Sequence, residues 1–281
     1  VDMATLAPRD PAVAKLIDRV RAEVPEQAQP IVVEGVRRVL DFQDVDYANL
    51  YLDRLKKISR FARPDDVALV RETGRYLALW MSYEDAIRVA ELKTRASRFD
   101  RVHKEVRAAD GQIVAINEYM HPRVEEISEI LPFASVGRWL MRPTWGNKLV
   151  KSLTKSGRVI QTSSVRGFIP LYLLSGFKRW RRRTLRYQAE QQRIESWLKQ
   201  IEQAADAHPA LALEIAQCQR LVKGYGDTHA RGLRNYQTVM SALERNPSTL
   251  SPAMLGALRD AALADEHGSK LEATLRQYAL V

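Results

Sequence analysis

One uninterrupted stretch, residues 76–106, constrains the fold more than any other part of the chain, because it contains neither proline nor glycine. Apolar and small side chains recur along it at alternating steps of four and three; they are Tyr76, Trp80, Tyr83, Ile87, Ala90 and Thr94. This spacing places them on one face of an α-helix. Glu84 precedes Arg88 by four positions and Glu91 precedes Arg95 in the same way, an order that favours attractive pairs on a helix. The stretch is therefore predicted to be one core helix of an all-α domain.

Signals for further helices lie on both sides of this stretch. Asp10-Pro11 is typical of a helix start, and Pro30 and Asp46 begin two more segments with helical apolar spacing. The short connections between these segments are those of antiparallel neighbours in a helical bundle. One short extended segment is predicted near 113–119, where apolar residues alternate after a turn pair. The predicted fold class is all-α: a multi-helix bundle, in one or two helical subdomains, with at most this minor β segment.

Two helical halves are expected along the chain. The first comprises residues 1–136 and is built on the core helix. Residues 137–147 combine tryptophan, proline and glycine, and they are predicted to form a connecting loop. The second half, residues 148–281, is predicted to contain a short basic helix at 148–155, then a long basic helix, and finally the C-terminal helices.

Positive charge is concentrated in one basic block, residues 138–186. The chain carries 44 Lys and Arg against 34 Asp and Glu, yet it has no acidic residue from 130 to 189. The long helix of this block is predicted to start at Ser163 or Ser164 and to bend near Pro170 and near Gly176. Its most basic segment supplies six candidate residues for docking an anionic partner; they are Lys178, Arg179, Arg181, Arg182, Arg183 and Arg186.

Several kinds of partner fit this basic block. Cations beside Trp180 and Tyr187 are typical of nucleic-acid binding, because they neutralise phosphates and stack on bases. The adjoining apolar run, 168–177, needs a covering surface, which favours docking on an acidic protein surface instead. A helix lying on a membrane surface is a third and weaker interpretation. Nucleic acid is the main alternative to a protein partner and is the less favoured of the two.

A glycine turn near residues 223–228 is the second candidate site. Two glycines before a helix start, with cations close by, are the general requirement for binding an anion at free backbone amides. The candidate residues are Lys223, Gly224, Gly226, Thr228, Arg231 and Arg234, and the expected ligand is a phosphate of CoA or an acidic side chain. An ordinary turn fits the same residues, with Gly224 as a left-handed cap of one helix and Asp227 as the N-cap of the next.

The sequence offers little for catalysis or metal binding. Cys218 is the only cysteine, which excludes an intrachain disulfide, an all-cysteine zinc site and a four-thiolate iron–sulfur cluster within the chain. No two of the five histidines have the helical spacing of metal ligands, and no nucleophile elbow is present. We therefore predict no catalytic residue, no metal and no cofactor in this chain. No apolar run approaches the ~18 residues of a membrane span, and a cytoplasmic location is expected.

Four segments in order resemble one protein family. They are YLDRL at 51–55, YEDAIRVA at 83–90, YMHPRVEE at 119–126 and LVKGYGDT at 221–228. Together they resemble the C-terminal helical region of the beta subunit of indolepyruvate (arylpyruvate) oxidoreductases, in the 2-oxoacid oxidoreductase family, over most of residues 46–245.

The resemblance implies that the chain is a fragment of a larger subunit, as its opening at Val1 also suggests. Its implied partners are the N-terminal gamma-type domain of the same subunit and the subunit that binds thiamine diphosphate. The whole enzyme would decarboxylate arylpyruvates oxidatively to arylacetyl-CoA, with thiamine diphosphate, an iron–sulfur cluster and CoA as substrate, and pass electrons to ferredoxin or another acceptor. The resemblance transfers no catalytic residue. The fragment is therefore expected to be inactive alone and to serve assembly, shielding of the active centre, or the lining of a path for CoA or an electron acceptor.

Overall fold

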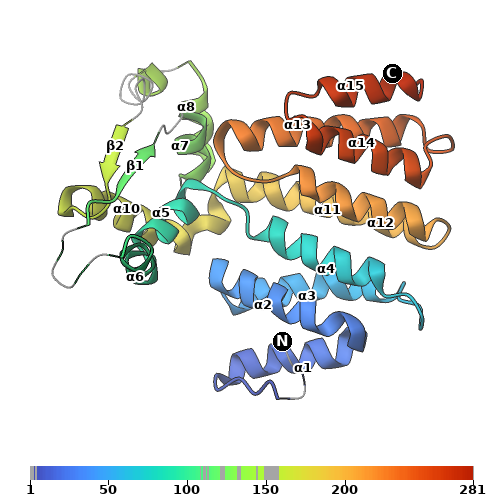
Figure 1. Cartoon of the computed structure of the whole chain (residues 1–281), viewed down its shortest axis with the longest axis horizontal. Coiled ribbons are helices and arrows are strands. Elements are labelled where there is room, and N and C mark those ends of the chain that lie inside the picture. The colour runs from blue at the N-terminus through green and yellow to red at the C-terminus, as the bar shows by residue number, and fades with distance from the viewer. Residues whose placement is uncertain are drawn as a thin grey trace. The chain divides into compact units, whose positions relative to one another are not determined.

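The computed structural model describes residues 3, 5–107, 109, 112, 114–120, 124–131, 134–143, 145–148 and 158–280. Nearly all regular structure in this part of the chain is helical (Figure 1). The helices are α1 (Pro11–Glu23), η1 (Glu26–Ala28), α2 (Gln29–Phe42), α3 (Val45–Ser59), α4 (Ala68–Met81), α5 (Ala86–Thr94), α6 (Ala96–Glu105), α7 (Val124–Ile130), α8 (Ala134–Met141), α10 (Val165–Ser175), η2 (Gly176–Arg183), α11 (Leu185–Ala205), α12 (Pro209–Gln217), η3 (Cys218–Leu221), α13 (Gly226–Arg245), α14 (Pro252–Ala264) and α15 (Ser269–Gln277). The strands are β1 (Asn117–Met120) and β2 (Arg158–Gln161). The predicted all-α class is confirmed.

The chain divides into two compact units. Unit 1 combines Val1–Tyr83 with Glu190–Val281, and unit 2 is Glu84–Ala189. Unit 1 thus combines an N-terminal and a C-terminal segment of the chain. The packing of α12 against α4 holds these two segments together. These units differ from the two halves expected from the sequence, since residues 137–147 lie inside unit 2 and α8 covers part of them.

Helix α4 is the centre of unit 1 and packs against α2, α3 and α12 (Figure 1). Trp80 of α4 is buried, with its ring 5.5 Å from that of Trp197 and 5.3 Å from that of Tyr236. Close helix packing also depends on Gly35, where an added Cβ would lie 2.3 Å from the Tyr51 hydroxyl oxygen. That hydroxyl donates a hydrogen bond of 2.9 Å to the carbonyl of Gly74, which lies within α4. The buried face predicted around Trp80 is therefore present.

The single helix predicted over 76–106 is wrong, because this stretch contains parts of three helices. The amide of Ser82 bonds the carbonyls of Ala78 and Leu79 and ends α4. Asp85 then caps α5, since its carboxylate accepts a hydrogen bond of 2.6 Å from the amide of Arg88. Arg95 is extended and separates α5 from α6. An acidic N-cap satisfies amides that a continuous helix would bond internally, so Asp85 favours a new start.

Unit 2 contains the only sheet in the described part of the chain. Strands β1 and β2 pair antiparallel, and Tyr119 lies opposite Val159. The extended segment predicted near 113–119 is thus present from Asn117, while Ile113 lies outside the described residues. Glu118 on β1 accepts hydrogen bonds from Lys93 of α5 and Arg98 of α6, which attach the hairpin to these helices.

The long basic helix predicted from Ser163 or Ser164 is divided into α10, η2 and α11. Its start is correct, because the Ser164 hydroxyl caps α10 by accepting a hydrogen bond from the amide of Gly167. Pro170 lies within α10 without ending it. The helix ends at Gly176, the second predicted position, and a further break, which was not predicted, comes at Thr184. The Thr184 hydroxyl accepts from the amide of Tyr187, as an N-cap does. The basic helix predicted at 148–155 lies outside the described residues after Lys148.

Candidate functional site

Helix α10 carries an exposed apolar stripe. Val165, Ile169, Tyr172 and Leu173 are 73%, 49%, 60% and 64% exposed, and their spacing places them on one side of the helix. We call these four residues the α10 stripe. The helix also packs against α5, and Leu171 is buried. A helix that is apolar on both its packed and its exposed side is typical of one that has a further partner.

The hairpin exposes another apolar pair. Tyr119 and Val159, which lie opposite each other in the two strands, are 72% and 68% exposed. Cross-strand neighbours have their side chains on the same face of a sheet, so the two side chains form one exposed apolar patch. Unit 2 therefore has unburied apolar groups on its sheet as well as on α10.

Arg181, one of the six predicted docking residues, cannot contact a partner because it is completely buried. Its Nε donates a hydrogen bond of 3.0 Å to Asp85 Oδ2, and its Nη2 donates one of 3.3 Å to Oδ1. Asp85 is the N-cap of α5, so this ion pair joins η2 to the start of α5. A buried carboxylate requires such a neutralising partner. The prediction that Arg181 docks a partner is therefore wrong.

Two more of the six cations also have partners within unit 2. Lys178 Nζ lies 3.5 Å from Glu91 Oε1, and Arg186 donates to Glu129 Oε2 at 3.3 Å. Burial tends to raise the pKa of Glu91, but hydrogen bonds from Arg95 and Arg88 outweigh it, so that this pKa is lowered overall. The acids concerned come before residue 130, outside the acid-free block, and sequence spacing could not indicate these pairs.

The remaining three docking candidates are on the surface. Arg179, Arg182 and Arg183 are exposed, as is Arg166 at the start of α10. The guanidinium of Arg179 lies over the Trp180 ring, 5.3 Å from its centroid. Unit 2 thus presents exposed cations together with an exposed apolar helix face. Of the six predicted docking residues, only Arg179, Arg182 and Arg183 are among these exposed cations.

The glycine turn adopts the predicted backbone in part. Gly224 and Gly226 have φ values of 72° and 62°, the left-handed region that favours glycine. Helix α13 begins at Gly226, and its N-cap Tyr225 makes no capping hydrogen bond with its side chain. Asp227 lies in the first turn, so the expectation that it is the N-cap is wrong.

The six residues of the predicted anion site are not brought together around one ligand position. Arg231 donates to Glu266 Oε2 at 3.1 Å, so its charge is already paired. Lys223 and Thr228 line a cavity of only about 20 Å³, which is far below the ~300 Å³ of a typical ligand pocket. Arg234 lines a different groove, on the side of α13 that faces α15. The turn is best described as a helix connection.

A buried carboxylate, Glu190, is a feature that sequence reasoning missed. Its Oε2 accepts a hydrogen bond of 3.0 Å from Trp80 Nε1, and its Oε1 accepts one of 3.1 Å from Arg193. His229 Nε2 lies 3.5 Å from the same Oε1. Glu190 is completely buried, so this cluster forms an internal polar network that fixes α11 against α4 and α13.

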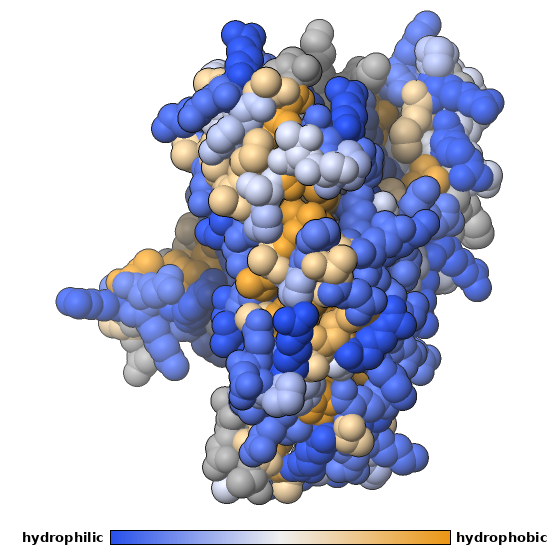
Figure 2. Space-filling model, turned by 90° about the vertical axis from the view of Figure 1, so that its right-hand side faces the viewer, coloured by the Kyte–Doolittle hydropathy of each residue, from blue (hydrophilic) through white to orange (hydrophobic). Residues whose placement is uncertain are grey.

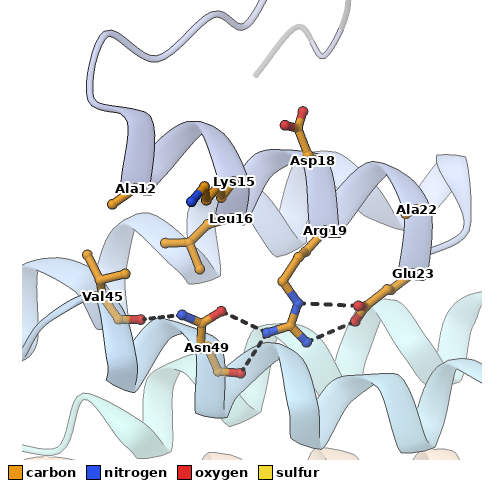
Figure 3. A pocket seen from close by; sticks show the side chains of 9 residues that line it. All are labelled: Ala12, Lys15, Leu16, Asp18, Arg19, Ala22, Glu23, Val45 and Asn49. Atoms are coloured by element: carbon orange, nitrogen blue, oxygen red, sulfur yellow. Dashed lines mark hydrogen bonds and ion pairs between the residues drawn. The ribbon is translucent and has the colours of Figure 1, made fainter.

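Unit 1 has a groove of about 570 Å³ between α1 and α3 (Figure 3). Its lining residues are Ala12, Lys15, Leu16, Asp18, Arg19, Ala22, Glu23, Val45 and Asn49. The guanidinium of Arg19 points toward Asn49 and Glu23 and also donates to Asp53 at 2.7 Å. The hydrogen bond to Glu23 is the main cause of a raised Arg19 pKa. Because Arg19 already has three acceptors within the protein, its charge is not available to a ligand in this groove.

The one cysteine has no nucleophilic character. Cys218 is buried in η3, and burial raises the pKa of its thiol to about 12. Within the described residues, no group of three or more His, Cys, Asp or Glu side chains is arranged to hold a metal ion. The helices of the same residues include none with the length and apolar character needed to cross a membrane.

Comparison with known proteins gives one match. Residues 28–242, more than half of the chain, match the model of a family of unknown function, DUF6537. The chain belongs to the DUF6537 family. The DUF6537 match includes the α10 stripe and the glycine turn, whereas α1 comes before it and α15 after it. None of the curated proteins and none of the solved structures matches.

Proposed function

We propose that this chain is an accessory helical domain of an indolepyruvate-type 2-oxoacid oxidoreductase subunit, and that it serves in assembly. The whole enzyme would convert arylpyruvates to arylacetyl-CoA in the cytoplasm, with thiamine diphosphate bound chiefly by a partner subunit and electrons passed to ferredoxin or another acceptor. The proposal is supported by the four segments that resemble that family and by the α10 stripe.

The observation that carries the assembly role is the exposure of the α10 stripe. Four apolar side chains on one helix face are each about half exposed or more. Full burial of an exposed aliphatic or aromatic side chain contributes roughly 1.5–3 kcal/mol. Covering this stripe would therefore supply much of the free energy of a protein interface. The exposed Arg166 and Arg183 would favour a partner surface with carboxylates around an apolar centre.

The direct test is docking of the chain on the thiamine-binding subunit of an indolepyruvate-type enzyme. Tyr172→Ala should weaken the complex by about tenfold or more, because it removes a large side chain from the interface. Tyr225→Ala is the matched control, since Tyr225 is similarly exposed but belongs to unit 1. Size-exclusion chromatography and a titration by interferometry would measure both.

A turnover assay is the second measurement that tests this proposal. The chain alone should give no turnover with arylpyruvate, CoA and a viologen dye, whereas the assembled enzyme should. Turnover by the chain alone would contradict an accessory role. Absence of any complex with the thiamine-binding subunit would equally reject the proposed parent enzyme.

A nucleic-acid-binding module is the alternative function. The specific observation in its favour is Trp180, which is partly exposed and stacked by Arg179, with Arg182 and Arg183 exposed beside it in sequence. Such a module should bind single-stranded or duplex DNA below micromolar concentration at ~150 mM salt, with a steep loss as salt rises. Arg179→Gln would then weaken binding, and Tyr172→Ala would not.

A further inference from the structure

A groove of about 430 Å³ lies between α13 and α15 in unit 1. Its lining residues are Arg234, Gln237, Thr238, Ser241, Ala242, Arg245, Leu275 and Leu280. No acidic side chain is among them. The groove therefore has a cationic and hydroxyl-bearing wall, contributed by α13, and an apolar wall, contributed by α15 and the residues after it.

The polar wall is one face of α13. Arg234, Thr238, Ser241 and Arg245 follow each other at steps of four, three and four, which places them in a line along the helix. With a rise of about 1.5 Å per residue, the backbone positions of the two arginines are roughly 16 Å apart. Both arginines are exposed, and neither has an ion pair with a residue of the described chain. Arg231, one turn earlier, is paired with Glu266 instead.

The apolar wall depends on how α15 ends. Ala279 has a φ of 53°, and its amide donates to the carbonyl of Arg276. The amide of Leu280 then donates to the carbonyl of Leu275 at 3.0 Å. These two bonds form a Schellman motif, in which the residue after the left-handed position folds back onto the last turn. Leu280 and Leu275 are thereby brought together along one side of the groove.

We propose that this groove binds an acidic peptide segment of a partner protein, with one carboxylate held by Arg234 and a second by Arg245. The residue between them would lie over Leu275 and Leu280, which form the floor of the groove and are 8% and 5% exposed. The guanidinium fork matches a carboxylate, and the Thr238 and Ser241 hydroxyls offer donors between the two ends. A span of roughly 16 Å equals about five residues of extended chain or eleven of helix. At this backbone spacing, a ligand that extends over several residues can place a carboxylate beside each arginine. This site is separate from the α10 stripe and does not rest on the function proposed above.

The test uses fluorescence anisotropy of the complete 281-residue chain with labelled peptides. One peptide carries two glutamates five residues apart around a leucine, another carries them eleven residues apart in a helix-forming sequence, and a third has glutamine at both positions. One glutamate peptide should bind, and the glutamine peptide should bind at least about tenfold more weakly, because charge-assisted hydrogen bonds are lost. Equal binding of the glutamine peptide would overturn the proposal.

Variants then identify the site. Arg234→Gln and Arg245→Gln should each weaken the glutamate peptide by about tenfold. Arg276→Gln is the matched control, since Arg276 is exposed on α15 but does not line the groove, and it should change binding less than about twofold. A peptide with only one glutamate should respond to only one of the two arginine substitutions. Inorganic pyrophosphate competing as well as the peptide would contradict a spanning ligand, as would unchanged binding in the double variant.

Discussion

Units 1 and 2 differ in how many of their large apolar side chains are exposed. In the described part of unit 1, the large apolar side chains that remain exposed are Leu79 and Tyr225. Figure 2 shows a mostly hydrophilic surface over helices of unit 1, with a narrow apolar strip running along it. Unit 2 is smaller and exposes the α10 stripe, the Tyr119 and Val159 pair, and tryptophans of the 137–147 region. Unit 1 therefore buries nearly all of its described large apolar side chains, whereas unit 2 leaves a group of them exposed.

The two units also differ in how their interiors are built. Unit 1 centres on aromatic packing around Trp80, and Glu190 is the one buried carboxylate among its described residues. Unit 1 has further buried charges, since Arg54 and Arg259 are 4% and 6% exposed. In unit 2, both members of the pair formed by Asp85 and Arg181 are buried.

The largest effect is expected in the core of unit 1. Trp80→Ala should lower the free energy of unfolding by roughly 3–5 kcal/mol, because it leaves a cavity beside Trp197 and removes a hydrogen bond from buried Glu190. Urea unfolding followed by circular dichroism measures this change. A loss below about 1 kcal/mol would mean that Trp80 does not hold this core together.

A somewhat smaller loss is expected from the buried ion pair of unit 2. Arg181→Met should cost about 3 kcal/mol, because it leaves the Asp85 carboxylate buried without its counter-ion. Arg183→Met is the matched control, since Arg183 is exposed in the same helical segment, and its effect should stay within about 0.5 kcal/mol. Equal effects of the two substitutions would show that Arg181 is not buried in solution.

The smallest effect is expected from the α10 stripe in the isolated chain. Leu173→Ala should change the free energy of unfolding by less than about 0.5 kcal/mol, because the side chain is exposed. Leu171→Ala, two residues earlier on the buried face, should cost roughly 2–5 kcal/mol. Comparable losses from both leucines would contradict the two-sided character of α10 and remove the surface on which the proposed assembly role depends.

Local signals in the sequence predicted the fold class and several helix starts. The Ser164 cap, the left-handed Gly224 and the buried face around Trp80 are all visible in short-range patterns. The break at Asp85 was missed because apolar spacing continues across it, although the residue itself is a good N-cap. Strand β2 was missed because only pairing with β1 stabilises so short a segment.

Long-range contacts account for the remaining errors. Arg181 pairs with Asp85 across 96 positions, so composition alone assigned it to the surface. Glu266, in the connection after α14, accepts a hydrogen bond from Arg231. The charge of Arg231 is therefore neutralised within the protein and does not contribute to the predicted anion site. The division into two units depends on α12 packing against α4, which no local pattern in either segment indicates. Charge and spacing identify a helix surface but not which distant element covers it.

Hydrogen–deuterium exchange of the chain, free and with the thiamine-binding subunit of an indolepyruvate-type enzyme, tests the central claim most directly. That claim is that α10 is the surface of unit 2 that a partner covers. Amides of Val165–Ser175 should exchange about tenfold more slowly in the complex, while those of α13, Gly226–Arg245, should keep their rates. A complex that forms and leaves exchange in α10 unchanged would contradict the account.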